Sequence, residues 1–296
     1  MTAVDETSGG LAPGRRRLTR QNVSGLLLVA FPVGLLVALV LVPTVRLVLG
    51  TFWVTAVDGA ALGFDRYQAF FTDAYSMANL RYTVVMTLAS CVTALTLSLG
   101  IALYLRFSPG RIATLIHALS LFPLFVPAII ISYALVRFLG PNGLLQMLLE
   151  QVGFTHFRTP YLTPVGPFLA FVWENLPLPV LVLSAGLTQI SDNAVEAARD
   201  LGAGFARILR EILLPQLKRS LLIAFALIFL GIIGAYTVPY LLGPPAPEMM
   251  SVFIQRTLGN LRRPAEAEVQ AVVLMAIASV VGALYIVTML RVRDRQ

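Results

Sequence analysis

The sequence predicts an all-α integral membrane protein with six transmembrane helices and both termini in the cytoplasm. Hydrophobic residues make up 57% of the 296 residues and charged residues only 12%, about half the charged share of an average soluble domain. Six apolar runs reach the ~20 residues that a helix needs to cross a bilayer. Because no water-soluble segment of domain size remains outside these runs, the membrane is the expected environment of the whole chain.

The N-terminal segment divides into a polar tail and the first apolar run. Residues 1–22 are rich in Gly and Arg and predict a disordered cytoplasmic tail. Residues 23–50 are too long for the hydrophobic region of a signal peptide, which has roughly 7–15 residues. We therefore expect an uncleaved first span, kinked or bounded by Pro32 and Pro43, and one transmembrane domain over 23–296.

Five further runs predict the remaining spans. They lie at about 82–105, 112–139, 164–187, 220–242 and 267–290. Pro123 and Pro127 interrupt the second of these runs, and Pro177 and Pro179 lie inside the third. Prolines remove a backbone donor, so both runs are expected to depart from a regular helix.

Basic residues set the orientation of the chain. With the N-terminus inside, 14 of the 22 basic residues but only 7 of the 15 acidic residues fall on cytoplasmic segments. The whole net charge of +7 then lies on one side, as the positive-inside rule requires. The segment 188–219 is cytoplasmic in this topology. The lipid bilayer therefore accounts for the basic composition without a nucleic-acid partner.

Catalytic chemistry has little support in the sequence. The single cysteine, Cys91, lies in an apolar run, and the two histidines are far apart, so neither a disulfide nor a metal site is predicted. The phosphate-binding pattern GxxxxGK[ST], HExxH and GxSxG are all missing from the sequence. We expect no catalytic residue and no cofactor, and energy for any transport must come from another subunit or from an ion gradient.

The charged stretch 188–219 differs from the rest of the chain. It predicts two short helices: one capped by Ser191 or Asp192 and ended at Leu201-Gly202, and one over about 205–214. Pro215 is expected to interrupt the second helix. One interpretation is an amphipathic loop on the membrane surface, and the other is a docking module for a soluble partner.

An ionisable residue near the middle of the run 164–187, the fourth of the six, marks a candidate pathway. Glu174 lies between Trp173 and Asn175, at a depth where a carboxylate usually faces a cavity or a partner. Tyr236 and Tyr240, near the outer end of the fifth run, are further candidates for lining this pathway. The alternative is a buried carboxylate that hydrogen-bonds to a neighbouring helix.

The stretch 188–219 also carries a spaced motif, EAA-x3-G-x9-I-x-LP. Its residues are Glu196, Ala197, Ala198, Gly202, Ile212, Leu214 and Pro215. This motif resembles the EAA loop of permease subunits of bacterial ATP-binding-cassette (ABC) importers, whose fold is the type I importer permease fold. The resemblance implies that these residues form coupling helices in a groove of the ATPase. The small alanines would allow close approach, and Gly202 would allow a tight turn that a side chain would block. Glu196 would cap a helix, pair with a basic group on the partner or form a hydrogen bond within the loop.

The same resemblance implies partners, location and a class of substrate. Such a permease works in the bacterial cytoplasmic (inner) membrane with an ABC ATPase dimer, a second permease, expected to be a different chain, and an extracytoplasmic substrate-binding protein. The stretches GFDRYQAFFTD, PLFVPAIIISYAL, GPNGLLQMLL and GAYTVPYLLGPP resemble the polyamine branch, most closely spermidine/putrescine permeases. A small cationic solute is the expected substrate, with aminophosphonate, iron(III) or thiamine as alternatives. An ion-coupled secondary transporter is the other class of function considered.

Overall fold

The computed structural model describes residues 20–56, 59–108, 110–154 and 159–290. These residues are almost entirely helical, as the sequence predicts. A short two-stranded sheet, β1 (Trp53–Ala56) and β2 (Gly59–Leu62), is an element that the sequence did not predict. The chain forms two compact units, residues 1–53 and 54–296, and each is described by itself. Most of the predicted N-terminal tail lies outside the described residues.

The first unit contains one long apolar helical segment. It consists of α1 (Arg20–Leu36), a π-turn η1 (Val37–Leu41) and α2 (Val42–Thr51). The Val42 amide donates to the Val37 carbonyl within the π-turn, so the hydrogen-bond register shifts directly before Pro43. The proline then falls in the first turn of α2, where its missing N–H is tolerated. Neither Pro32 nor Pro43 ends the segment.

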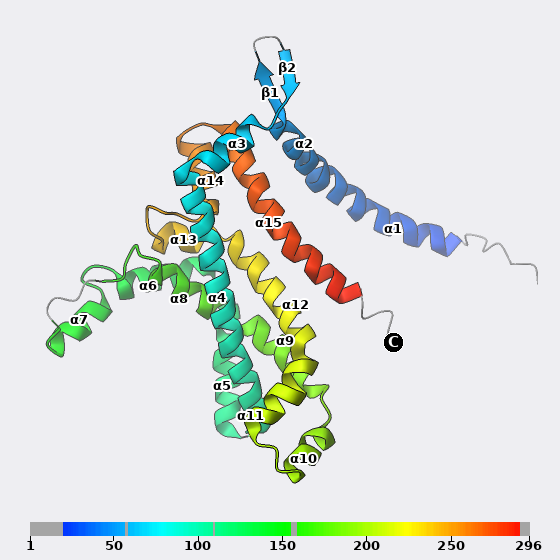
Figure 1. Ribbon diagram of the computed structural model, residues 1–296, viewed down its shortest axis with the longest axis vertical. Helices are drawn as coiled ribbons and strands as arrows, with labels where there is room; N and C mark the ends of the chain where they lie inside the picture. Colours follow the sequence, from blue (N-terminus) through cyan, green and yellow to red (C-terminus); the bar gives the residue numbers. More distant parts are fainter. Residues whose placement is uncertain (1–19, 57–58, 109, 155–158, 291–296) are drawn as a thin grey trace, which may run out of the picture. The chain divides into compact units, whose positions relative to one another are not determined.

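Helix α4 (Ala74–Phe107) is the longest helix of the second unit (Figure 1). Its 34 residues extend about 50 Å at 1.5 Å per residue, well beyond the ~30 Å hydrocarbon layer. Asp73 caps it by accepting a 2.8 Å hydrogen bond from the Ser76 amide, and α3 (Asp65–Thr72) precedes the cap. Helix α4 packs against α8, α9 and α12, so it is the common neighbour of the helices that carry the candidate sites.

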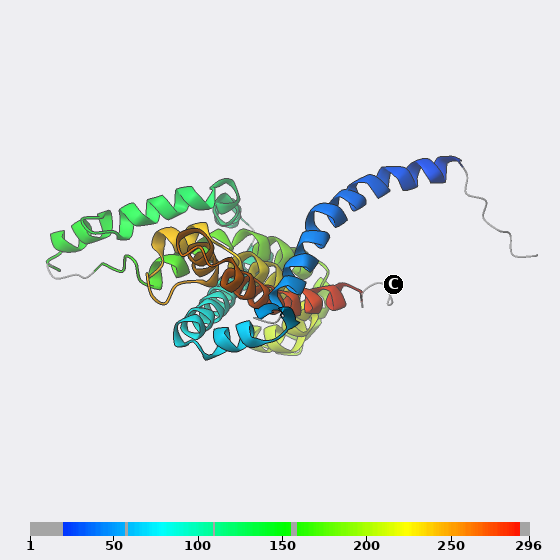
Figure 2. The ribbon, with the colours of Figure 1, turned by 90° about the horizontal axis from the view of Figure 1, so that it is seen from above.

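The predicted span 112–139 is not one continuous helix. The chain forms α5 (Arg111–Leu121), a 3-10 turn η2 (Phe122–Phe125), α6 (Ala128–Leu139) and α7 (Leu144–Gln151). The break contains Pro123 and Pro127, which lack the amide donors of a regular helix. Helices α6 and α7 reach away from the α4–α12 bundle in both views (Figures 1 and 2).

The predicted span 164–187 is also broken. Helices α8 (Val165–Glu174) and α9 (Pro177–Thr188) meet at an angle of 42°. Pro177 and Pro179 both lie in the first turn of α9, where no intrahelical amide is needed. The second proline therefore does not distort α9 further. The break leaves Glu174 as the last residue of α8.

The remaining helices complete the second unit. They are α10 (Asp192–Asp200), α11 (Phe205–Ile208), π-turn η3 (Leu209–Leu213), α12 (Leu214–Ile233), α13 (Thr237–Leu242), α14 (Met250–Gln255), π-turn η4 (Arg256–Asn260) and α15 (Pro264–Leu290). Five helical segments of the described chain are long and apolar enough to cross a membrane, or six if α8 and α9 form one span. The predicted boundaries of the six spans stay a prediction, since the structure contains no membrane.

Helices α9 and α12 approach each other closely at Gly186. A side-chain carbon there would lie 2.5 Å from Ser220 Oγ and 2.9 Å from a Leu217 methyl carbon. The apolar cluster around this contact includes the fully buried Leu183, Leu187 and Leu213. Because the cluster continues into α10 and α11, the polar stretch 188–219 is attached to the helix bundle through apolar packing.

Candidate functional site

The segment from Asp192 to Pro215 lies at one end of the second unit (Figure 1), where α10 and α11 form a pair of short helices. On the inner face of the pair, Val195 and Ile208 are 3% and 2% exposed and belong to the cluster around Leu187. Ala198 and Ile212 pack on the same cluster. The apolar positions of the motif therefore hold the pair against the bundle.

Gly202 ends α10 as the sequence predicts. Its φ is +80°, its amide donates to the Arg199 carbonyl at 2.8 Å, and the Ala203 amide donates to the Ala198 carbonyl at 2.9 Å. These two hydrogen bonds form a Schellman motif, in which the left-handed residue is normally glycine. A side-chain carbon at Gly202 would meet no atom of this chain within 4 Å. Backbone conformation, and not crowding within the chain, is thus the reason for glycine here.

The predicted end of the second helix at Pro215 is wrong. Helix α11 continues through π-turn η3 into α12, and the Leu214 amide donates to the Leu209 carbonyl. The π-turn shifts the hydrogen-bond register before the proline, which then falls in the first turn of α12. The second half of the motif is consequently continuous with the helix that enters the predicted membrane region.

The outer face of the pair is exposed. Glu196 and Ala197 point away from the cluster, and Leu201 is 89% exposed. Helix α10 ends at Asp200, which leaves Leu201 beside Gly202 at the turn. Among the described residues, the Glu196 carboxylate has no hydrogen bond or ion pair. Small, apolar and acidic residues thus form an exposed surface on the outer face of the pair.

The C-terminal end of α4 contacts this pair of helices, a role that sequence reasoning did not assign. Arg106 Nη2 donates to Asp192 Oδ1 at 2.6 Å and to the Ile190 carbonyl at 2.8 Å. The next residue, Phe107, lies 5.6 Å from the Arg199 guanidinium and 6.0 Å from the Phe205 ring. Ser191 occupies the N-cap position of α10 but makes no capping hydrogen bond. The start of α10 is therefore held by the Arg106 side chain and not by a Ser191 cap.

Glu174 lines a cavity of about 250 Å³ at the break between α8 and α9. The other lining residues are Ala128, Phe171, Asn175, Gly231, Ala235, Tyr236, Thr237 and Val238. The structure thus brings together three of the five predicted pathway residues, Glu174, Asn175 and Tyr236. Among the described residues, the Glu174 carboxylate has no hydrogen-bond or ion-pair partner, so the structure gives no support to a carboxylate bonded to a neighbouring helix.

The other two predicted pathway residues lie outside this cavity. Trp173 packs edge-on against Phe122, with ring centroids 6.4 Å apart. Tyr240 stacks on Tyr236 at 5.1 Å with an interplanar angle of 21°, so it extends the aromatic surface beside the cavity. The Asn175 side-chain amide donates to the Phe171 carbonyl at 2.9 Å. The side-chain oxygen of Asn175 would lie 3.7 Å from a side-chain carbon added at Gly231.

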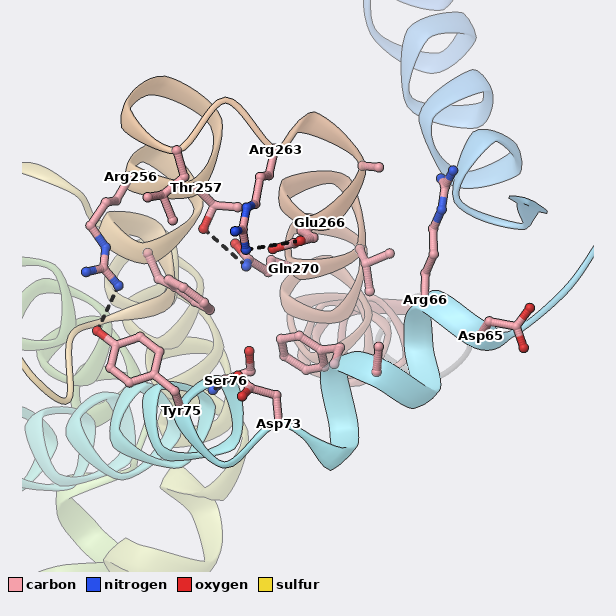
Figure 3. Close-up of a pocket in the computed structure, with 16 residues that line it drawn as sticks. Asp65, Arg66, Asp73, Tyr75, Ser76, Arg256, Thr257, Arg263, Glu266 and Gln270 are labelled. Carbon is pink, nitrogen blue, oxygen red and sulfur yellow. Dashed lines mark hydrogen bonds and ion pairs between the residues drawn. The ribbon is translucent and has the colours of Figure 1, made fainter. Parts of the chain in front are cut away.

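A larger cavity of about 700 Å³ lies at the opposite end of α4, between α3, η4 and the start of α15 (Figure 3). Arg256 reaches from its wall to Tyr75 Oη at 2.8 Å and to Glu248 Oε1 at 2.6 Å. Burial raises the pKa of the Glu248 carboxyl, while Arg256 and Tyr75 act in the opposite direction. This network fixes the turn before α14, together with the 3.0 Å bond from the Glu248 amide to Asn79.

Comparison with known proteins identifies the class to which this arrangement belongs. Residues 94–295 match the family described as binding-protein-dependent transport system inner membrane component. Since the match covers more than half of the chain, the chain belongs to this family and is a permease subunit of an ABC importer. It is an integral protein of the inner membrane, as the sequence predicts.

Several permeases are similar to the chain along most of its length. The sulfoquinovosyl glycerol permease SmoG of Agrobacterium fabrum is 28% identical, with 89% of each chain covered. The spermidine/putrescine permease PotB of Salmonella typhimurium is 26% identical over 78% of this chain and 81% of its own length. The thiamine permease ThiP of Brucella abortus is 30% identical over 74% of this chain, which spans only 40% of that relative.

Solved structures show the same fold. A chain of a bacterial ABC transporter involved in the import of the acidic polysaccharide alginate has a TM-score of 0.70 at 16% identity, with 94% of this chain and 97% of that chain covered. A chain of the alginate transporter in complex with an alginate pentasaccharide-bound periplasmic protein has a TM-score of 0.72 at 17% identity, with coverages of 91% and 96%. The type I importer permease fold predicted from the motif is confirmed.

Proposed function

We propose that the chain forms half of a translocation pathway and is driven by ATPase subunits that dock on the exposed face of α10 and the following turn. The observation that carries the proposal is the exposed Leu201, 89% accessible beside Glu196 and Ala197. Leu201 lies in the turn that follows α10, and burying its side chain in an apolar pocket of a partner would be favourable because it removes apolar surface from water. The chain itself is a non-catalytic transport subunit, and the ATPase dimer hydrolyses ATP.

The complete assembly proposed here contains three kinds of partner. A second, different permease chain completes the pathway, two ATPase subunits bind on the predicted cytoplasmic side, and a substrate-binding protein delivers substrate on the other side. The continuity of α11 with α12 through η3 supports the mechanical part of this proposal, because a rigid helical connection transmits a displacement better than a flexible loop.

A small cationic solute such as a polyamine is the proposed substrate. The Glu174 carboxylate lines the cavity at the helix break, and an ionisable group at that depth is expensive unless it faces water or a cation. Aminophosphonate, iron(III) and thiamine are the alternatives within the same branch. The stacked rings of Tyr236 and Tyr240 favour a second candidate, a sugar-containing solute, because flat aromatic surfaces bind sugar rings and SmoG is by name a sulfoquinovosyl glycerol permease.

Uptake by reconstituted vesicles tests the energy source. The chain is co-expressed with the ABC ATPase, the second permease and the binding protein of the proposed assembly, and spermidine is the first probe. We expect uptake to require ATP hydrolysis and to survive ionophores that collapse proton and sodium gradients. Uptake that does not require ATP hydrolysis and stops when the ion gradients collapse would indicate an ion-coupled secondary transporter instead.

A further inference from the structure

Helix α4 contacts both functional regions of the chain. At its predicted cytoplasmic end, Arg106 and Phe107 contact Asp192, Arg199 and Phe205. These three residues belong to α10 and α11, the two helices of the segment 192–215, which we call the docking segment. Eight residues earlier, Ser98 Oγ donates to the Leu176 carbonyl at 3.2 Å. Leu176 lies in the break that carries Glu174. These two points on α4 are about 12 Å apart along the helix.

The Arg106 contact joins a largely buried cation to an exposed carboxylate. The Arg106 side chain is 15% exposed and the Asp192 side chain 75% exposed, and a single guanidinium nitrogen donates to both the Ile190 carbonyl and the Asp192 carboxylate. Hydrogen bonds between two charged groups are stronger than neutral ones. Since Ser191 makes no capping bond, this contact and the Phe107 ring act together with the apolar packing of Val195 to hold the start of α10 against α4.

We infer that Arg106 is a positioning residue that couples the ATPase-docking helix α10 to α4, and that α4 carries the displacement to the cavity at Glu174. The inference rests on the proposed function of the docking segment. It adds a second route to the covalent one through α12, and it assigns a role to a residue outside the EAA motif. The ion pair between Arg106 and Asp192 links residues 86 positions apart.

The first test measures movement at the cavity without any transported substrate. Thr237, which lines the Glu174 cavity, is replaced by cysteine, and maleimide labelling is measured with and without ATP in the complex with the ATPase. The native Cys91 is fully buried, so it contributes little labelling. We expect ATP to change the labelling rate, and we expect Arg106→Gln to reduce this change by about fivefold or more. Arg111→Gln, an exposed arginine nearby on the same predicted side, is the matched control.

The second test restores the ion pair by exchanging its two charges. Arg106→Asp removes the ion pair, and the double variant Arg106→Asp with Asp192→Arg forms it again in the reversed order. We expect the ATP-dependent change in labelling at position 237 to be reduced in Arg106→Asp and largely regained in the double variant. A full change in Arg106→Asp, or no recovery in the double variant, would overturn the inference.

Failure of the proposed function and failure of the inference about Arg106 give different results. If wild-type protein never retains the ATPase, the proposed function of the docking segment fails. If the ATPase is retained and ATP still changes labelling fully in Arg106→Gln, only the inference about Arg106 is wrong. A variant that loses the ATPase altogether would place Arg106 in the docking surface, which also contradicts a positioning role.

Discussion

Glu174 combines an ionisable side chain with a position at the break of a predicted membrane span. Its neighbours in the cavity, Asn175 and Tyr236, are uncharged. The carboxylate has no partner among the described residues, and this supports the proposed cationic substrate.

Replacing Glu174 with glutamine is expected to reduce spermidine uptake about tenfold, the effect of losing one charge-assisted contact worth about 1.5 kcal/mol. The measurement is the initial rate of ATP-driven uptake in vesicles. Glu150→Gln, an exposed carboxylate on α7, serves as control and should transport normally. If Glu174→Gln transports spermidine at the wild-type rate, Glu174 has a structural role and the pathway lies elsewhere.

Gly202 allows a prediction from backbone conformation alone. Its φ of +80° costs a side-chain-bearing residue roughly 1–2 kcal/mol, and most for β-branched residues. Gly202→Val should therefore displace the turn and weaken the stimulation of ATP hydrolysis by the loaded binding protein, whereas Gly202→Asn should retain most of it. Equal stimulation in the valine and asparagine variants would show that the turn conformation is not needed for coupling.

Among the elements, α4 depends on its cap. The Asp73 carboxylate accepts from the Ser76 amide at 2.8 Å, and hydrogen bonding with Ser76 lowers the pKa of Asp73 below 3.8. Its stabilising effect is therefore complete above pH 3.8 and is lost as the pH falls through the lower value of the folded state.

Asp73→Ala should lower stability by about 1 kcal/mol at neutral pH, whereas Asp73→Ser should retain most of the cap. Thermal unfolding of the detergent-solubilised protein measures the difference, which should shrink as the pH is lowered below 3.8. A constant difference between wild type and the alanine variant across this range would mean that the carboxylate charge does not contribute to the cap.

Local sequence signals predicted some elements and failed on others for physical reasons. The end of α10 was predictable because the Schellman turn selects glycine at one position. The continuation through Pro215 was not, because a π-turn five residues long relieves the proline and leaves no specific residue pattern. The contact of Arg106 with Asp192 could not be predicted either, because the two residues are 86 positions apart and only helix packing brings them together. Trp173 was a neighbour of Glu174 in sequence, but its ring points to Phe122.

At the scale of the whole molecule, the second unit carries the exposed face of α10 at one end and, separate from it, the cavity that Glu174 lines. Apolar packing extends from α10 and α11 to α9 and α12, and α4 contacts both the docking end and the helix break. These contacts support the proposed conversion of movement at α10 into a change at Glu174. Composition and charge predicted the membrane class, and the motif predicted the fold.

Binding of the ATPase to the purified chain tests the central claim most directly. The affinity of the partner ATPase is measured for wild type and for Leu201→Asp, which places a charge on the exposed apolar anchor without altering a buried contact. We expect wild type to bind and the variant to bind at least about tenfold more weakly, with unchanged membrane insertion and thermal stability. Equal binding by the two proteins would contradict docking through α10 and its turn.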